Sequence, residues 1–113
     1  MNKIMRFISL MVLTTCTTYS NAYIRGYVKY DDYQCESDHM VFETSSGYIL
    51  AEWYSGTLHS GNYFYADFHS YGFIDVYRNI EDADNEENEE GRIYIDDYMK
   101  GRSAAMEWCL GED

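Results

Sequence analysis

The sequence predicts a mainly β fold: a small antiparallel barrel of five to six strands, of OB- or SH3-like size, with a short C-terminal helix. Apolar side chains recur at every second position through most of the chain, which is typical of half-buried strands. Short stretches rich in Gly, Ser and Asp separate these runs, as turns do. The chain has only 113 residues, and many short strands in so short a meander favour a closed or half-closed barrel over a sandwich.

The first three predicted strands follow one another closely. Residues 23–30 alternate strictly, and Asp31-Asp32 ends this strand in a turn. The second strand is predicted at residues 40–44 and the third at 48–54. Ser45-Ser46-Gly47 lies between them and predicts a short hairpin turn, in which the glycine can adopt a positive φ.

Three more strands are predicted at residues 63–68, 73–78 and 92–99. Before the last of them lies an acidic segment, residues 81–90, which has no apolar period and is predicted to be a solvated loop. Three of its side chains have the spacing of the first EF-hand ligands: Asp82, Asp84 and Glu86. The motif then fails, because Glu87 and Ile93 stand where it needs Gly and Glu. Only an irregular calcium site stays open.

The C-terminus changes to a helical period at residues 104–110. Ser103 is the predicted N-cap of this helix, and Gly111 is a natural stop. Because the helix carries Cys109, a disulfide from that residue would dock it against the segment before the second strand.

The first 22 residues have the composition of a signal peptide. Lys3 and Arg6 precede a short apolar run at residues 7–13, and Ser20-Asn21-Ala22 puts small residues at the positions that signal peptidase reads. The apolar run is too short for a permanent membrane anchor, which needs about 20 residues. We expect cleavage after Ala22 and a single exported domain at residues 23–113, in the periplasm or outside the cell. A buried N-terminal helix is the alternative.

The three cysteines also bear on whether the protein is exported. Leu13-Thr14-Thr15-Cys16 resembles a degenerate lipoprotein box, but branched Thr15 fits poorly where Gly, Ala or Ser is usual, so we expect no lipid anchor. Cleavage would then leave only Cys35 and Cys109, which predicts one intramolecular disulfide in an oxidising compartment. Two buried free thiols are the alternative.

The alternation sorts the strand residues into two sets. One set is uncharged and is expected to form the core: Ile49, Ala51, Trp53, Phe64, Ala66, Phe68, Ile74, Val76, Ile93 and Ile95. The other set is expected to face outward: Tyr48, Leu50, Glu52, Tyr54, Tyr63, Tyr65, Asp67, Phe73, Asp75, Tyr77, Arg92, Tyr94, Asp96 and Tyr98. Tyrosines and carboxylates therefore share one face of the predicted sheet.

Two interpretations of this face compete. Tyrosines suit a pleated surface and could simply cover the outside of the barrel. Tyrosine is also enriched at interfaces, and neighbouring carboxylates would select Lys or Arg on a partner, with cation–π attraction from the rings. The predicted binding residues are Tyr48, Glu52, Tyr54, Tyr63, Tyr65, Asp67, Asp75, Tyr77 and Tyr94.

No complete catalytic or metal-binding set is visible in the sequence. Asp67 and His69 share a face if their strand extends that far, but no nucleophile accompanies them and zinc would need a further ligand. The neighbours in Asp31-Asp32 and in Asp96-Asp97 point to opposite faces of a strand, so neither pair can flank one glycosidic bond. We expect no enzyme, no cofactor and no metal.

Charge narrows the choice of partner. Without residues 1–22, six basic residues face 20 acidic ones, a formal net charge of −14. Such a charge argues against nucleic acid and anionic membranes. We expect a small acidic binding module that engages a cationic protein, for example an inhibitor or immunity-type protein that neutralises a basic enzyme or toxin. The alternatives are a carbohydrate- or envelope-binding module that uses the tyrosine-rich face, and a structural envelope protein. The sequence leaves the oligomeric state open.

Overall fold

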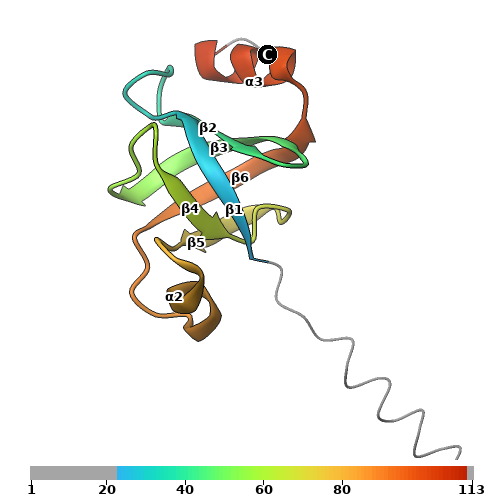
Figure 1. The fold of residues 1–113 in the computed structure, drawn as a ribbon. Coiled ribbons are helices and arrows are strands. Elements are labelled where there is room, and N and C mark those ends of the chain that lie inside the picture. The colour runs from blue at the N-terminus through green and yellow to red at the C-terminus, as the bar shows by residue number, and fades with distance from the viewer. Residues whose placement is uncertain (1–22, 112–113) are drawn as a thin grey trace, which may run out of the picture.

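The computed structural model describes residues 23–111. Six strands form one curled antiparallel sheet in the order β4-β1-β2-β3-β6-β5 (Figure 1). The strands are β1 (Ile24–Tyr30), β2 (His39–Thr44), β3 (Gly47–Gly56), β4 (Tyr63–Ala66), β5 (Gly72–Val76) and β6 (Gly91–Lys100), and the helices are α2 (Ile80–Asn85) and α3 (Arg102–Leu110). The predicted mainly β, barrel-like fold with a short C-terminal helix is confirmed.

The predicted signal peptide, residues 1–22, lies outside the described residues, and so does Cys16. Within residues 23–111, neither helix has the length and apolar character that a membrane span requires.

The two edge strands of the sheet, β4 and β5, meet at a single bridge. Tyr65 N–H donates to the Tyr77 carbonyl at 2.7 Å, and Tyr77 N–H donates to the Tyr65 carbonyl at 2.8 Å. The Tyr77 ring packs edge-on against Tyr23, with the centroids 5.8 Å apart. Tyr77 is therefore only 3% exposed, and its expected place on the outward face is wrong, because this residue belongs to the closure of the barrel.

The inside of the curled sheet is filled as the alternation predicted. Ile49, Ala51, Phe64, Ala66, Phe68, Val76, Ile93 and Ile95 are fully buried, and Trp53 and Ile74 pack against them. The Phe68 ring packs closely against β1, so that a Cβ on Gly26 would come within 2.6 Å of it. Glycine at position 26 is what allows this ring to close over the strand.

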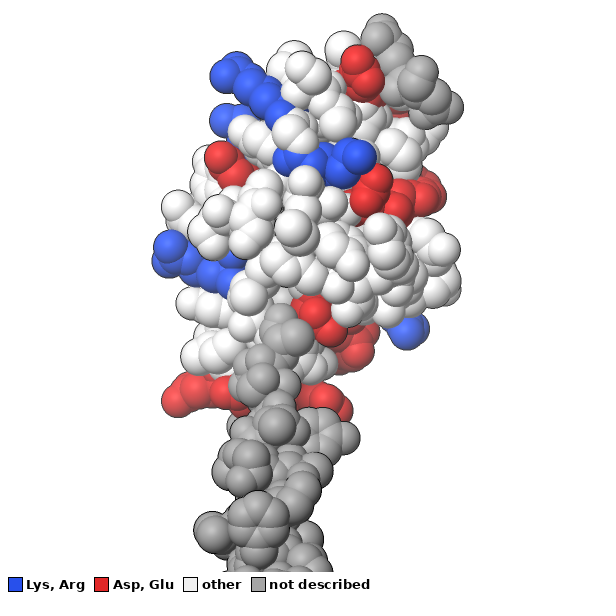
Figure 2. All heavy atoms as spheres, turned by 90° about the vertical axis from the view of Figure 1, so that its right-hand side faces the viewer, with Lys and Arg blue, Asp and Glu red and all other residues white. Residues whose placement is uncertain are grey.

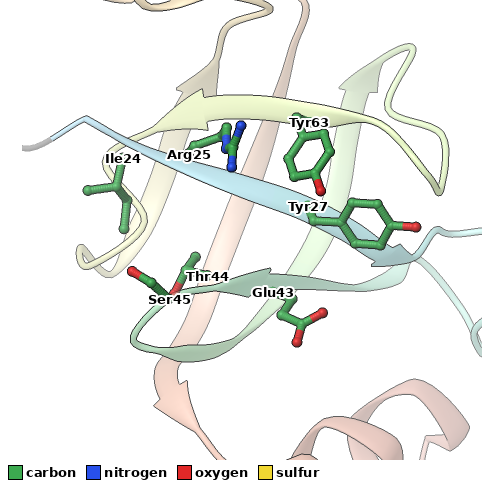
Figure 3. Close-up of a pocket in the computed structure, with 7 residues that line it drawn as sticks. All are labelled: Ile24, Arg25, Tyr27, Glu43, Thr44, Ser45 and Tyr63. Atoms are coloured by element: carbon green, nitrogen blue, oxygen red, sulfur yellow. The ribbon is translucent and has the colours of Figure 1, made fainter.

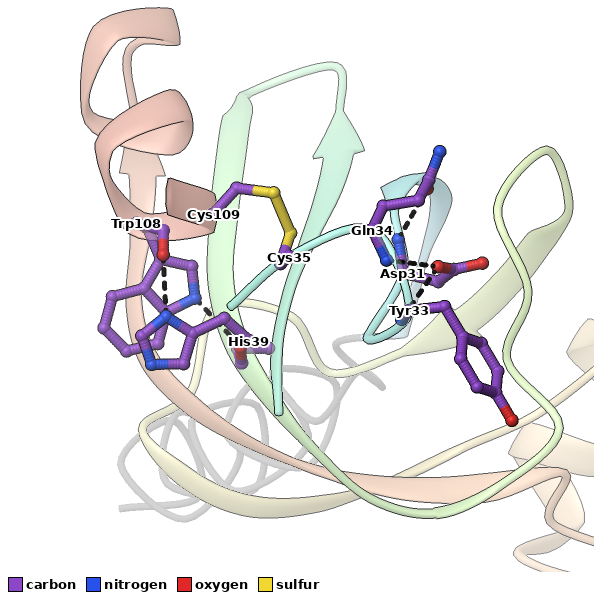
Figure 4. Close-up of a disulfide and its surroundings, with 8 residues drawn as sticks. Asp31, Tyr33, Gln34, Cys35, His39, Trp108 and Cys109 are labelled. Carbon is purple, nitrogen blue, oxygen red and sulfur yellow. Dashed lines mark hydrogen bonds between the residues drawn. A yellow bond between two sulfur atoms is a disulfide. The ribbon is translucent and has the colours of Figure 1, made fainter. Parts of the chain in front are cut away.

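Helix α3 covers part of the outer face of β2 and β3 (Figure 1). Val41 and Leu50 are buried against Ala105 and Cys109 in a second apolar cluster. Leu50 was expected to face outward, and it does lie on that side of the sheet, but the helix removes it from solvent. The predicted disulfide between Cys35 and Cys109 is present (Figure 4).

Of the two predictions for the ends of α3, one is wrong and one is confirmed. The predicted N-cap, Ser103, is wrong: the helix begins at Arg102, and its cap is Gly101, which offers no side-chain hydrogen bond. The predicted stop is confirmed, since Gly111 adopts a left-handed conformation with φ of 78° and closes the last turn through its backbone N–H.

The acidic segment is partly helical, which corrects the expectation of a solvated loop at residues 81–90. Asn79 caps α2 by accepting a hydrogen bond from the Asp82 N–H at 2.8 Å. Ala83 is fully buried, and the helix ends at Glu86 in a left-handed conformation. One buried alanine and one capping side chain are enough to order this turn, and neither produces an apolar period.

Candidate functional site

The predicted face of tyrosines and carboxylates is divided among several surfaces, because the sheet curls. Glu52, Tyr54 and Tyr94 lie together on β3 and β6, while Tyr63 lies on the opposite half of the sheet. A third surface, a hollow beside α2, is lined by Asp67, Asp75 and Tyr77. Tyr65 belongs to the barrel closure. Tyr48 packs against the apolar cluster under α3.

One of these surfaces, a groove on β3, β5 and β6, brings three outward rings into contact. We call it the ring groove; it has a volume of about 290 Å³ and is lined by Asp38, Glu52, Trp53, Tyr54, Phe73 and Tyr94. The Phe73 ring lies between the other two outward rings, with centroids 5.1 Å from Tyr54 and 5.0 Å from Tyr94, both in edge-to-face geometry. Tyr54 is 59% exposed, Phe73 51% and Tyr94 38%. Large apolar side chains this exposed in one contiguous patch are typical of interaction surfaces.

Carboxylates border the rings. Asp38 and Glu52 line the groove itself, and Asp96 lies next to Glu52. Asp96 has no partner in the ladder, because Leu50 pairs with Asp97 and Ala51 pairs with Ile95. Bulges of this kind re-aim a side chain. Here the bulge brings Asp96 within reach of the Glu52 carboxylate.

This pair of acids holds a proton unusually well. Partial burial, a hydrogen bond to Glu52 and the Glu52 charge raise the pKa of Asp96 to about 7, while the charge of His39 opposes the rise. The two carboxyl groups share a proton across this hydrogen bond. Near neutral pH the pair therefore carries less than its full formal charge.

His39 extends the row of titratable groups across β2, β3 and β6. It is the cross-strand partner of Glu52 and stacks on Trp108, with the rings 3.7 Å apart and 2° from parallel (Figure 4). Its Nδ1 lies 2.6 Å from the Trp108 carbonyl. A carbonyl only accepts, so Nδ1 carries the hydrogen and the helix fixes the orientation of the imidazole.

The pairing of Asp67 with His69 that the sequence left open does not form. Strand β4 ends at Ala66, and Asp67 accepts a hydrogen bond from the Ser70 hydroxyl at 2.7 Å. His69 stacks instead on Tyr98, with centroids 5.3 Å apart. In residues 23–111 no group of three or more His, Cys, Asp or Glu side chains is arranged to hold a metal ion.

The third hollow, of about 340 Å³, combines acids with two tyrosines, Tyr23 and Tyr77. Burial, followed by the nearby Tyr23 and Asp75, raises the pKa of Tyr77 to about 12. Burial also raises the pKa of Tyr23, and the charges of Glu86 and Asp67 add to the effect. Both phenols keep their hydrogens at physiological pH, and the residues act as neutral parts of the barrel closure.

Several residues of the ring groove were not predicted from the sequence. Phe73 is in the set expected to face outward but not among the predicted binding residues. Its position two residues before Asp75, on the same face of the strand, could have indicated it. Asp38 belongs to the loop before β2, and the Trp53 N–H, which donates to the Asp38 carbonyl at 2.7 Å, holds it beside the groove. The pairing of Asp96 with Glu52 depends on a bulge, and the strand pattern contains no sign of it.

No protein-family model, no curated protein and no solved structure matches this chain.

Proposed function

We propose that the protein is an exported, acidic binding module whose ring groove engages a cationic protein, in the manner of an inhibitor or immunity-type protein. The observation that carries the proposal is the contact of three exposed rings, Tyr54, Phe73 and Tyr94, in a groove bordered by carboxylates.

The groove has the two features that a Lys or Arg side chain requires. The rings offer rigid apolar area and negative faces to a cation, which contribute about 0.5–2 kcal/mol per well-placed pair. Asp38 and Glu52 supply the opposite charge. Phe73 already accepts an internal cation, since the Arg92 guanidinium lies 5.3 Å from its centroid while Asp75 holds that guanidinium at 3.6 Å.

Long-range charge supports the same partner. The formal charge of residues 23–113 draws basic proteins toward the molecule and repels anionic ones. Figure 2 shows that acidic and basic side chains are interspersed on the face it presents, so that charge alone does not define one patch there. The rings of the groove then supply the specific contact.

Export is part of the proposal. The Cys35–Cys109 disulfide is compatible with an oxidising compartment. Together with the signal-peptide composition of residues 1–22, it supports a place in the periplasm or outside the cell.

The proposal is tested with the purified, disulfide-bonded protein and a set of basic secreted enzymes, lysozymes and ribonucleases among them. Tyr54→Ala and Phe73→Ala should weaken the complex by about 2 kcal/mol, roughly 30-fold, without a matching loss of thermal stability. Tyr33→Ala is the matched control, because this ring is 83% exposed and lies outside the groove. Glu52→Gln should mainly slow association and reduce its salt dependence. Unchanged affinity in both ring variants, with lower melting temperatures, would reject the groove as the binding surface.

A further inference from the structure

A second hollow lies over β1, β2 and β4, on the half of the sheet away from the ring groove (Figure 3). Its volume is about 550 Å³, within the range of about 300–1,000 Å³ that is usual for small-molecule sites. The side chains that matter for its chemistry are Arg25, Tyr27, Glu43, Ser45 and Tyr63.

The hollow exists because two neighbouring strands separate. β1 and β2 pair only from Tyr27 and Glu43 onward, whereas residues 24–26 pair with β4 alone. On the other side, Thr44 pairs with Gly47 across the hairpin. The side of β1 that faces β2 therefore has no strand partner at this end. Side chains of both strands line the gap between them.

The two strands that border the hollow carry opposite charges, which form no ion pair with each other. Arg25 is exposed on β1, Glu43 is exposed on β2, and neither belongs to an ion pair within residues 23–111. The Arg25 guanidinium lies 4.5 Å from the centroid of Tyr63, which holds it in place by a cation–π contact. Its N–H fork remains available for a ligand.

Rings and an ordered turn complete the walls. Tyr27 and Tyr63 lie 5.1 Å apart at an angle of 58°, and Tyr63 is 50% exposed. The Thr44 hydroxyl donates to the Gly47 carbonyl at 2.8 Å and accepts from the Ser46 N–H at 3.2 Å. These bonds fix the hairpin turn, so the Ser45 end of the hollow has a defined shape.

We infer that this hollow is a binding site for a neutral saccharide, one pyranose unit of a glycan. Sugar hydroxyls both donate and accept, so that one hydroxyl can accept from the Arg25 fork while another donates to the Glu43 carboxylate. The apolar face of the sugar ring fits against an exposed tyrosine ring. One cation and one anion leave the hollow formally balanced, which favours an uncharged ligand. The ring groove, bordered by carboxylates, favours a cation.

The test is a titration of the disulfide-bonded protein with a panel of neutral and acidic oligosaccharides, followed by NMR and calorimetry. We expect at least one neutral oligosaccharide to bind saturably, with equal affinity at 50 and 500 mM salt. Arg25→Ala and Glu43→Ala should each weaken that binding at least tenfold, and Tyr63→Phe should retain most of it because the ring stays. Tyr54→Ala, in the ring groove, should leave it unchanged.

Several results would overturn the inference. One is the absence of saturable binding by any neutral oligosaccharide up to 20 mM. Another is neutral-sugar binding that Arg25→Ala leaves intact in a correctly folded variant, as judged by circular dichroism. Binding confined to acidic oligosaccharides and lost at high salt would assign the hollow to anions instead. Because the variants lie on opposite halves of the sheet, failure here leaves the proposal of a cationic partner untouched, and the reverse also holds.

Discussion

At the scale of single residues, Asp31 shows how a local turn becomes part of the fold. Its carboxylate is only 6% exposed and accepts three backbone hydrogen bonds, from Tyr33 and Gln34 at 3.1 Å and from Ser60 at 3.0 Å (Figure 4 draws the first two residues). The last of these bonds ties the turn after β1 to the loop before β4. The sequence identified the turn, but it contained no indication of the long-range bond to Ser60.

Asp31→Ala should therefore cost far more than a typical surface change. It leaves three backbone donors without their partner, and hydrogen bonds to charged groups contribute about 1.5–3 kcal/mol each before relaxation and water offset part of the loss. We expect a loss of about 2–4 kcal/mol in the free energy of unfolding, measured by urea denaturation. Asp32→Ala is the control and should change stability little. Equal effects of the two variants would show that the Asp31 bonds are not structural.

Asp96 makes stability depend on pH. Its pKa is raised from an ordinary 3.8 to about 7 by partial burial and by Glu52, so the folded protein binds a proton that the unfolded chain has released. This contribution is fully present below about pH 4 and is lost as the pH rises through 7. Asp96→Asn should remove it, so that the melting temperature of the variant falls less than that of the wild type between pH 4.5 and pH 8.

The control for this measurement is Glu107→Gln, which removes an exposed carboxylate on α3. It should reproduce the wild-type pH profile with at most a constant offset. Parallel profiles for the wild type and Asp96→Asn would show that the Glu52–Asp96 pair does not hold a proton near neutrality.

At the scale of elements, α3 depends on its anchors more than on its own helix signals. It has no side-chain N-cap, and Met106 and Leu110 are 40% and 56% exposed. The helix is held by Cys109, by the Trp108 indole N–H, which donates to the Ala51 carbonyl at 2.9 Å, and by the stacking of His39 on Trp108. The disulfide was predictable from the cysteine count together with the expected cleavage after Ala22, while the tryptophan contacts required the fold.

Replacing both cysteines should loosen α3 first. The disulfide spans 74 residues, and its loss costs about 4 kcal/mol in the chain-entropy model. Cys35→Ala/Cys109→Ala should lower the melting temperature by well over 10 °C, since about 1 kcal/mol corresponds to about 4–8 °C in a domain of this size. Near-ultraviolet circular dichroism from Trp108 should also change. A double variant as stable as the wild type, with an unchanged tryptophan signal, would contradict this account.

Helix α2 makes the acidic segment two elements rather than one loop. Asn79→Ala should destabilise the protein by about 1 kcal/mol through loss of the cap. Replacing residues 86–89 with Gly and Ser should be neutral or stabilising at low salt, because Glu86 and Asn88 both have positive φ and the change removes like charges. Thermal melts in 20 and 500 mM salt separate these effects. A loss of several kcal/mol from the 86–89 replacement would show that this stretch is structural as well.

At the scale of the whole molecule, alternation predicted the side of the sheet for most strand residues, with Tyr77 as an exception, and the curl decided which residues meet. Alternation places Tyr54 and Tyr63 on the same outward face, yet they lie on opposite halves of the sheet. Pairing order, bulges and the closure at Tyr65 and Tyr77 arise from contacts between distant segments, which a local pattern does not contain. The residues predicted for the core all pack there, but the core also contains Val28, Met40, Phe42 and Leu58, which the predicted set lacked. The surfaces were not predictable from the alternation.

The ring groove is the surface that we propose receives a cationic protein. The most direct test is to map amide chemical shifts while a cationic enzyme that binds is added to the isotopically labelled protein. We expect the perturbed amides to cluster at residues 52–54, 72–75 and 92–96, and we expect Phe73→Ala to reduce the response. Perturbations confined to the β1 and β4 side around Tyr27 and Tyr63, or spread evenly over the acidic surface and abolished by 150 mM salt, would contradict the proposal.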